Sequence, residues 1–412
     1  MHVMVVSCVF PPEPVVSALT SSDIVEALIE DGHYVTVATS FPNRPAGKLY
    51  DGHSRRLFER EKSSTGYDIV RCFATISKTS SIFSRLLENL SFGLTSGWIA
   101  LTSPRPDVFY VNTWPLIATG ITYLISKWRK VPIVINIQDV YPESLISQQR
   151  IRSDGLIARF MEWLDSTISR GAKAIIVISE NFANIYRNQR HVDSNNIHVI
   201  NNWINKDKIN ISISPEEFRK KKKISHGDFL IVYGGNIGVA AGVETIISSM
   251  GYLSDRHNIR LLVAGAGSRL QACRELDGNI LGECVLFHSP WLPEETSEVL
   301  RAADLLVLPT LGKQSAASVP SKLISYMLSA RPVIALAVPE SDISYLVEHS
   351  GCGWVVETDR PDLLAEKIEE VMRLDPAELQ RRGVMGRDYA LQYFANEACL
   401  PKVIKILEDS GR

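Results

Sequence analysis

The sequence has few cysteines, and none of them lies in a paired motif. Six cysteines are scattered along the chain, without a Cys-x-x-Cys spacing. This usage argues against a zinc site or a disulfide framework and indicates a reducing compartment. The chain also lacks a His-Glu-x-x-His pattern and an Asp-x-Asp motif, which are common ligand arrangements for catalytic metals. We therefore expect no bound metal and no cofactor.

An excess of charge of one sign and long apolar runs are also missing. With 44 basic and 46 acidic side chains the net charge is −2, so the chain lacks the basic excess expected of a nucleic-acid-binding protein. No run of about 18 apolar residues occurs, so no segment is expected to span a membrane. The apolar start of the chain stops at Pro11-Pro12 and has no basic region before it, which favours a buried strand over a signal peptide. These features predict a cytoplasmic protein.

The length of the chain predicts more than one domain. At 412 residues, 45% of them hydrophobic, the sequence is too long for a single compact core. Short β-rich runs alternate with helical stretches, among them 17–31, 82–101, 117–129 and 155–170. The runs expected as strands are 3–10, 34–39, 69–73, 108–111, 133–137, 174–178 and 198–200, followed by 229–233, 260–264, 285–288, 305–309, 332–335 and 353–356.

Both series of expected strands are apolar and separated by helices. Such strands form parallel sheets covered on both faces, so we expect an α/β protein with two Rossmann-like, doubly wound domains. Ligands in open parallel sheets bind beyond the carboxyl ends of the strands, and two facing sheets would form an interdomain cleft. We expect an N-terminal domain at 1–205, a C-terminal domain at 206–384, and helices that cross back to the domain junction at 385–412.

Two segments of the second half have the pattern of phosphate-binding turns. The segment 230–242, LIVYGGNIGVAAG, and the segment 317–331, ASVPSKLISYMLSAR, each lead a strand or loop into a helix. The N-terminus of a helix presents unpaired N–H groups and about half a positive charge, which suits a diphosphate. Together they predict a nucleotide diphosphate held mainly by backbone groups, as a nucleotide-sugar transferase would need.

Ten short motifs follow one another along nearly the whole chain. They are FPPEP (10–14), LIEDGHYVTVATSFPNRP (28–45), NIQDVYPES (136–144), VISENF (177–182), VINNW (199–203), YGGNIG (233–238), VAGAG (263–267), AADLLVLPT (302–310), VPSKL (319–323) and GCGWVV (351–356). In this order they resemble the family-4 retaining glycosyltransferases of GT-B fold, and among these the members that assemble bacterial O-antigen, capsule or colanic-acid repeat units. The resemblance implies a nucleotide-sugar donor, UDP more readily than GDP, on the second domain. It also implies a polyprenyl-diphosphate-linked saccharide acceptor on the first domain and no metal requirement.

The expected donor site lies in the second half of the chain. Glycines that follow a strand let the backbone approach a phosphate that a Cβ would crowd. Lys322 is the best cation to stabilise the leaving group, because charge develops on the diphosphate as the glycosidic bond breaks. We expect Trp291 to contact the base and Asp342 to face the donor sugar. The expected donor-binding residues are Gly234, Gly235, Asn236, Gly238, Gly265, Trp291, Pro320, Ser321, Lys322, Leu323 and Asp342.

Structural explanations for the same residues stay open. The glycines would also suit a tight turn without a ligand, Lys322 a solvated position on a capped helix, and Asp342 a helix cap. The sequence departs from the family pattern as well. Ala241 stands where relatives commonly carry Lys or Gln, and Ala317 and Ser325 stand where the broad family has two glutamates. Catalysis would then depend on the groups that remain.

The acceptor is expected at loops of the first half. Gln138 and Asp139 follow a strand at its carboxyl end, where many relatives have a His-Asp pair. Asp139 either holds the acceptor hydroxyl or caps the following turn, and Glu13 either touches a substrate or lies near a helix N-terminus. Trp114 is either an acceptor contact or a core aromatic. Front-face attack with retention needs no protein nucleophile, so the expected catalytic residues are Lys322, Asn236 and Asp139.

One apolar stretch of the first half allows a peripheral membrane location. Residues 81–101 contain few charges, and Lys127, Arg129 and Lys130 flank Trp128. Apolar insertion and basic attraction could seat the first domain on the inner face of the plasma membrane. A core helix beside an ordinary charged loop explains the same residues equally well.

Two further functions stay open beside the transferase. Sugar-nucleotide epimerases share the GT-B fold, although the sequence does not display the acids and histidines that such an enzyme needs. A catalytically silent partner protein is the other alternative, because several family side chains are replaced. Fold alone does not decide among the three.

Overall fold

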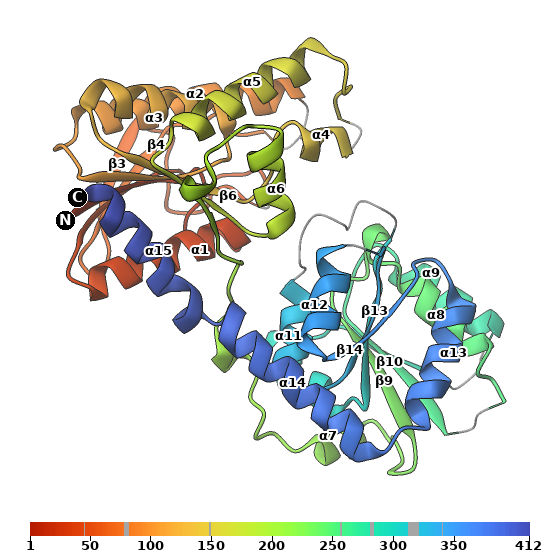
Figure 1. Cartoon of the computed structure of the whole chain (residues 1–412). Helices are drawn as coiled ribbons and strands as arrows, with labels where there is room; N and C mark the ends of the chain where they lie inside the picture. The colour runs from red at the N-terminus through yellow and green to blue at the C-terminus, as the bar shows by residue number, and fades with distance from the viewer. Residues whose placement is uncertain are drawn as a thin grey trace. The chain divides into compact units, whose positions relative to one another are not determined.

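The computed structural model describes residues 1–44, 46–77, 82–147, 150–255, 258–280, 284–311, 321–339 and 341–412. These residues form two compact units. Unit 1 comprises Met1–Asn202 and Cys399–Arg412, and unit 2 comprises Trp203–Ala398. Figure 1 colours both by residue number.

Within its described residues, unit 1 contains an eight-stranded sheet in the order β3-β4-β2-β1-β5-β6-β7-β8. Neighbouring strands are parallel except for β3 and β4. Strands β2 to β4 lie on one side of β1, and β5 to β8 lie on the other side. The strand order therefore reverses between β1 and β5. Open parallel sheets bind ligands at such a reversal. The strands are β1 His2–Val6, β2 Tyr34–Ser40, β3 Phe58–Lys62, β4 Asp68–Cys72, β5 Val108–Asn112, β6 Ile133–Ile137, β7 Ala174–Val177 and β8 Ile197–Val199.

The central strands of this sheet are buried over their whole length. All five residues of β5 and of β6 are buried, as expected where helices cover both faces. The helices of unit 1 are α1 Val16–Glu30, α2 Ile82–Thr102, α3 Leu116–Arg129, α4 Glu143–Ser147, α5 Leu156–Gly171 and α6 Glu180–Asn188, with a 3₁₀ turn η1 at Ser194–Asn196.

Small residues bring α2, α3 and α5 side by side on one face of the sheet (Figure 1). An added Cβ at Gly93 or Gly97 of α2 would lie 2.8 Å from a side-chain carbon of Ile121 on α3. A Cβ at Gly120 of α3 would lie 3.3 Å from Leu164 on α5. Because these positions lack side chains, the three helix backbones can approach closely.

The described residues of unit 2 form a six-stranded parallel sheet in the order β11-β10-β9-β12-β13-β14. Its strand order reverses between β9 and β12, which pair through Leu305 with Ile231 and Leu306 with Val232. One apolar cluster packs on each face of the sheet. The strands are β9 Phe229–Gly234, β10 Ile259–Ala264, β11 Val285–His288, β12 Leu305–Leu308, β13 Val333–Leu336 and β14 Gly353–Val356.

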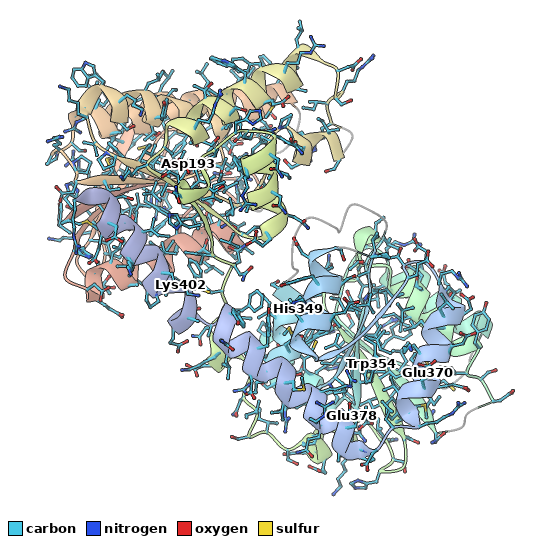
Figure 2. All side chains as sticks on the ribbon, in the orientation of Figure 1. Asp193, His349, Trp354, Glu370, Glu378 and Lys402 are labelled. Carbon is cyan, nitrogen blue, oxygen red and sulfur yellow. The ribbon has the colours of Figure 1, made fainter. Side chains whose placement is uncertain are left out.

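The helices of unit 2 cover this sheet and continue into the last helix of the chain. Arg382 joins α14 to β14, because its guanidinium lies 4.6 Å from the ring centroid of Trp354 while its Nε donates to Glu378 over 2.9 Å. Figure 2 labels Trp354 on β14 and Glu378 on α14. The helices are α7 Pro215–Lys221, α8 Val243–Gly251, α9 Leu270–Ile280, α10 Thr296–Ala302, α11 Ser321–Leu328, α12 Asp342–Ser350, α13 Pro361–Met372, α14 Pro376–Phe394 and α15 Asn396–Gly411, with 3₁₀ turns η2 Lys206–Lys208, η3 Val239–Ala241 and η4 Pro293–Glu295.

Helix α15 returns the chain to unit 1 from Cys399 onward. There, Glu408 lies 3.1 Å from the Nε2 atom of His33, and a Cβ at Gly411 would lie 3.0 Å from the sulfur of Met1. The residues at both ends of the chain therefore pack in the same unit.

Candidate functional site

Two glycine loops of unit 2 pack backbone against backbone at the ends of β9 and β10. A Cβ at Gly265 would lie 1.9 Å from the carbonyl oxygen of Gly235, and a Cβ at Gly267 would lie 2.2 Å from that of Ile237. Gly265 also has a φ of +146°, a conformation that disfavours a side chain. The N–H of Gly235 donates to the carbonyl of Ala264 over 2.9 Å. Two of the predicted donor-binding glycines, Gly235 and Gly265, are thus brought into contact.

Tyr326 of α11 fixes the end of β9. Its hydroxyl accepts the N–H of Gly234 over 2.9 Å and donates to the carbonyl of the same residue over 3.1 Å. The side chain is buried, so both groups are shielded from water. Lys322 lies four residues earlier on the same helix and hence on the same face. The clamp therefore holds the first turn of α11 against the glycine loop.

Lys322 lies directly over Gly235. A Cβ at Gly235 would lie 2.2 Å from the Cε atom of Lys322. The Nζ atom donates to the Tyr233 hydroxyl over 2.6 Å and to the Asn236 carbonyl over 3.4 Å. Burial lowers the pKa of Lys322 to about 8, and in the described part of the chain no carboxylate offsets this effect. The result is a cation beside exposed backbone, held without a counter-ion.

The other predicted residues of this loop, Asn236 and Gly238, make their contacts within the loop itself. The Asn236 side chain packs over Gly238, since its Nδ2 atom lies 2.9 Å from where a Cβ of Gly238 would be. The carbonyl of Asn236 accepts the Tyr233 hydroxyl over 2.6 Å. Gly242, with a φ of +64°, leads into α8. The loop is therefore fixed by its own hydrogen bonds and by α11.

The remaining predicted donor residues occupy different environments. A ring carbon of Trp291 lies 3.0 Å from where a Cβ of Gly234 would be, and within the described residues its buried indole N–H has no acceptor. Ser321 is exposed at the start of α11, whereas the Leu323 side chain is part of the core. Asp342 is the first residue of α12. Pro320 and Ala317 lie outside the described residues.

Sequence patterns did not identify His288, at the end of β11. Its carbonyl accepts the N–H of Gly265 over 3.0 Å, which ties it to the glycine loops. Its ring nitrogens lie 2.9 Å from Lys222 Nζ and 3.0 Å from a Glu295 oxygen. Its position in the sequence could have identified it, because His288 is the last residue of an expected parallel strand. Ligands of open parallel sheets bind at these carboxyl ends.

Unit 1 has a cavity of about 240 Å³ at the carboxyl ends of β1, β5 and β6. It lies at the reversal of strand order between β1 and β5. Three of the four predicted acceptor residues line it: Trp114, Gln138 and Asp139. The full lining is Val9, Val15, Ser17, Arg44, Asn112, Trp114, Gln138, Asp139 and Tyr141.

A chain of amides orients Gln138 in this cavity. Its oxygen accepts from Asn202 over 2.8 Å, and its nitrogen donates to Asn136 over 3.3 Å. Asn136 in turn donates to the Asn112 side chain over 3.1 Å. Beside this network, burial raises the pKa of Asp139. A partly desolvated carboxylate of this kind suits hydrogen bonding to an acceptor hydroxyl.

Glu13, the fourth predicted acceptor residue, is only 1% exposed. One carboxylate oxygen accepts the backbone N–H groups of Asn43 and Arg44 over 2.8 and 2.9 Å. Burial raises the pKa of Glu13, and these hydrogen bonds oppose the shift. The side chain therefore positions the loop that carries Arg44, a contribution that neither interpretation from sequence included.

Arg44 itself was missed because its partners are distant in sequence. Its guanidinium lies 4.4 Å from the ring centroid of Trp114 and donates to Glu88 over 2.7 Å. This cation–π contact fixes Trp114 at the cavity wall. The aromatic residue is thus both a packing partner and a wall of the cavity.

The described part of unit 1 contains one group of side chains that could act as metal ligands, and none of them is a predicted site residue. Among the described residues, His53, Glu59 and Glu61 form a group whose ligand atoms could reach one ion, but Glu61 already pairs with Arg71 over 3.2 Å.

Of the helices that the structure describes, none has the length and apolarity needed to cross a bilayer.

Two family models match the chain. The model described as "Glycosyltransferase Family 4" matches residues 20–208, and the model described as "Glycosyl transferases group 1" matches residues 228–373. The chain is 24% identical over 320 residues to "Probable glycosyltransferase WbjE" of Pseudomonas aeruginosa, covering 76% of each chain. It is 22% identical over 417 aligned residues to "Putative colanic acid biosynthesis glycosyl transferase WcaI" of Escherichia coli, covering 98% of this chain and 99% of the relative.

Solved structures share the fold at low identity. Anabaena Alr3699/HepE, solved in complex with UDP, superposes with a TM-score of 0.67 at 13% identity and covers 99% of this chain and 100% of its own. WaaG, "a glycosyltransferase involved in lipopolysaccharide biosynthesis", superposes with a TM-score of 0.66 at 16% identity, covering 98% and 99%.

Proposed function

This chain belongs to the glycosyltransferases of GT-B fold, with a family 4 domain followed by a group 1 domain, and we propose that it transfers a sugar from a nucleotide-diphosphate sugar to a lipid-linked saccharide. The observation that carries the proposal is the position of Lys322 over Gly235. There a half-buried cation without a carboxylate partner among the described residues adjoins backbone that any Cβ would cover. A diphosphate supplies the charge and the acceptor oxygens that this arrangement needs.

We take UDP as the more favoured nucleotide. Neighbours of the same fold were solved with UDP and with UDP-glucose, which supports this choice over GDP. Relatives named for colanic acid and lipopolysaccharide biosynthesis support an acceptor that belongs to a bacterial surface polysaccharide. Such an acceptor would be presented at the inner face of the plasma membrane.

In the proposed reaction, the bond between the anomeric carbon and the diphosphate breaks as the acceptor hydroxyl attacks the same face. The departing diphosphate takes the hydroxyl proton, so configuration is retained without a protein nucleophile. Lys322 and the first turn of α11 stabilise the negative charge that develops on the diphosphate. Asp139 holds the acceptor hydroxyl by a hydrogen bond. No step requires a metal ion.

The test is calorimetric titration of the full chain with UDP and with GDP, each with and without Mg²⁺. Saturable UDP binding that is unchanged by Mg²⁺ is expected. Incubation of UDP-sugars with a polyprenyl-diphosphate-linked saccharide then separates the alternatives. Sugar transfer supports the proposal, whereas epimerisation of the free donor, or nucleotide binding without turnover, contradicts it.

A further inference from the structure

A second cavity of about 240 Å³ lies beside the first in unit 1. The two share four lining residues: Arg44, Trp114, Asp139 and Tyr141. The other walls of the second cavity come from α2, α4 and α5, the start of α3, and the stretch after α4. These residues are Arg85, Asn89, Leu116, Ser144, Leu145, Arg150 and Met161. The second cavity is thus an extension of the candidate acceptor site toward the surface helices.

Three guanidinium groups distinguish this cavity. Arg44 and Arg85 both pair with Glu88, over 2.7 and 2.6 Å, and Arg150 adds a third cation. Against these three positive charges stand the carboxylates of Glu88 and Asp139, so 3 − 2 leaves a net charge of +1. Within the described residues, the buried Nε–H of Arg44 has no acceptor. A cavity with surplus positive charge and an unused buried donor favours an anion.

The three cations share this cavity with a buried hydroxyl group. Tyr141 is 7% exposed and lies in both cavity walls. Burial and the charge of Asp139 raise the pKa of Tyr141, whereas the charges of Arg44, Arg150 and Arg85 act to lower it. All three guanidinium groups therefore contribute to the positive electrostatic field in this cavity, which suits a phosphate group.

The helices that wall this cavity also carry an apolar face. On α2 the exposed large apolar residues recur every three or four positions, which places them in one stripe. Helices α3 and α5 lie near α2 (Figure 1) and also carry exposed large apolar residues. The members are Phe83, Leu86, Leu87, Leu90, Leu94, Trp98 and Leu101 on α2, Leu124 and Trp128 on α3, and Leu156, Ile157, Phe160 and Trp163 on α5. We call these residues the apolar face of unit 1. Such a gathering marks an interaction site.

Cavity and apolar face meet along the same helix turns. Arg85 and Asn89 alternate with Phe83, Leu86 and Leu90 in the first turns of α2. On α5, Met161 lines the cavity next to the exposed Phe160, whose ring centroid lies 5.9 Å from that of Trp163. Basic Lys127 and Arg159 are exposed among these residues. The chemistry that matches is an anion joined directly to a long apolar chain.

We propose that the cavity of Arg44, Arg85 and Arg150 binds the diphosphate of a polyprenyl-linked acceptor, while the apolar face of unit 1 lies against the bilayer that holds the polyprenyl chain. This inference rests on the proposed function, because it assigns the acceptor to a site. The saccharide of the acceptor then extends into the first cavity, toward Gln138 and Asp139. The diphosphate, which carries two negative charges, complements the surplus positive charge.

The anion site is tested on the full chain with farnesyl diphosphate and with inorganic diphosphate, both by calorimetry. Loss of one charge-assisted hydrogen bond in Arg85→Gln or Arg150→Gln should weaken farnesyl diphosphate binding by about tenfold or more. The matched control is Arg152→Gln, because Arg152 is 84% exposed and pairs with Asp154. Equal weakening in all three variants, or no binding of farnesyl diphosphate to the unaltered chain, overturns the proposal. Binding of inorganic diphosphate alone shows a free-phosphate site and overturns it as well.

The apolar face is tested by sedimentation with vesicles of phosphatidylethanolamine and phosphatidylglycerol. The unaltered chain should sediment with them, and Phe83→Ser combined with Trp163→Ser should remain in the supernatant. Leu57→Ser removes an apolar side chain that is 65% exposed elsewhere in unit 1 and should have no effect. If the double variant instead disrupts a dimer in the absence of vesicles, the face joins two copies of the chain and the proposal fails.

UDP binding separates failure of this inference from failure of the proposed function. A chain that binds UDP but neither farnesyl diphosphate nor vesicles retains the proposed donor chemistry and loses only the acceptor site. A chain that binds neither UDP nor farnesyl diphosphate contradicts both.

Discussion

The Lys322 ammonium donates a hydrogen bond to the Tyr233 hydroxyl, with 2.6 Å between Nζ and Oη. The hydroxyl in turn donates a hydrogen bond to the carbonyl of Asn236, also over 2.6 Å. Tyr233 lies in the buried part of β9 and Lys322 in the first turn of α11, so this bond joins strand and helix at the glycine loop. It orients the cation before any ligand arrives, which is the preorganisation that electrostatic catalysis requires.

Replacement of this cation should slow the reaction. We expect Lys322→Ala to lower turnover on the order of 10²-fold, because charge on the departing diphosphate would lose its stabilising partner. Steady-state kinetics with the lipid-linked acceptor measure the change. Lys220→Ala removes an exposed lysine of α7 and serves as the control. Near-full activity of Lys322→Ala would remove this side chain from the mechanism.

Two glycine substitutions should separate ligand binding from folding. In Gly235→Ala the new Cβ meets the flexible end of Lys322, and the φ of +156° strains the backbone, so we expect UDP affinity to fall about tenfold or more with a smaller loss of stability than in Gly265→Ala. In Gly265→Ala the Cβ meets a backbone oxygen at 1.9 Å, so we expect a loss of roughly 1–3 kcal/mol in the free energy of unfolding. Urea unfolding and UDP titration distinguish the two. Gly227→Ala, where the Cβ meets open space, should change neither quantity.

UDP binding should depend on pH in a defined direction. Because burial lowers the Lys322 pKa to about 8, the free protein loses this charge as the pH rises from 7 to 9. A bound diphosphate favours the protonated lysine, so affinity should fall over this range and binding near pH 8 should take up a proton. Calorimetry in buffers of different ionisation enthalpy measures that uptake. Lys322→Arg stays charged and should lose the pH dependence; an unaltered dependence would assign it to another group.

Unit 1 contains a buried ion pair whose loss should destabilise it. Arg190 has no exposed side-chain surface and donates to Asp165 over 3.0 Å and to the Tyr141 carbonyl over 3.0 Å. It also pairs with Glu143 and Glu162, whose side chains are more exposed than that of Asp165. Arg190→Met leaves a buried carboxylate without its partner, at a cost of about 3–5 kcal/mol in the free energy of unfolding. Adding Asp165→Leu should recover most of the loss in urea unfolding. If the double variant is no more stable than Arg190→Met, the pair is not the source of the effect.

The alternation of apolar strands and helices predicted the fold correctly. The expected strand 133–137 matches β6 Ile133–Ile137, and 260–264 matches β10 Ile259–Ala264 to within one residue. These strands could be predicted because a strand buried on both faces consists almost entirely of apolar residues. The strand missed was β3 Phe58–Lys62, with the sequence FEREK. It is an antiparallel edge strand, where charged residues discourage further pairing, so composition gave no strand signal.

The candidate site was predictable only where it is local in sequence. The glycines of 234–238 indicated positions without room for a Cβ, and Gly235 packs against Lys322 and Gly265. That these glycines admit a phosphate stays a prediction. Tyr326 was not predicted as a clamp, because its partner Gly234 lies 92 residues away. Arg44 and Glu88, 44 residues apart, likewise meet only through the fold. Tertiary contacts of this kind leave no periodic pattern in the sequence.

The assignment of Cys399–Arg412 to unit 1 makes unit 2 an insertion within unit 1. During synthesis on the ribosome, every residue of unit 2 emerges before the segment that completes unit 1. Until Glu408 is made, the Nε2 atom of His33 in nascent unit 1 lacks this partner. A fragment ending at Asn202 would lack the segment Cys399–Arg412 that packs in unit 1. Unit 2, Trp203–Ala398, is one continuous segment and is therefore better suited to independent expression.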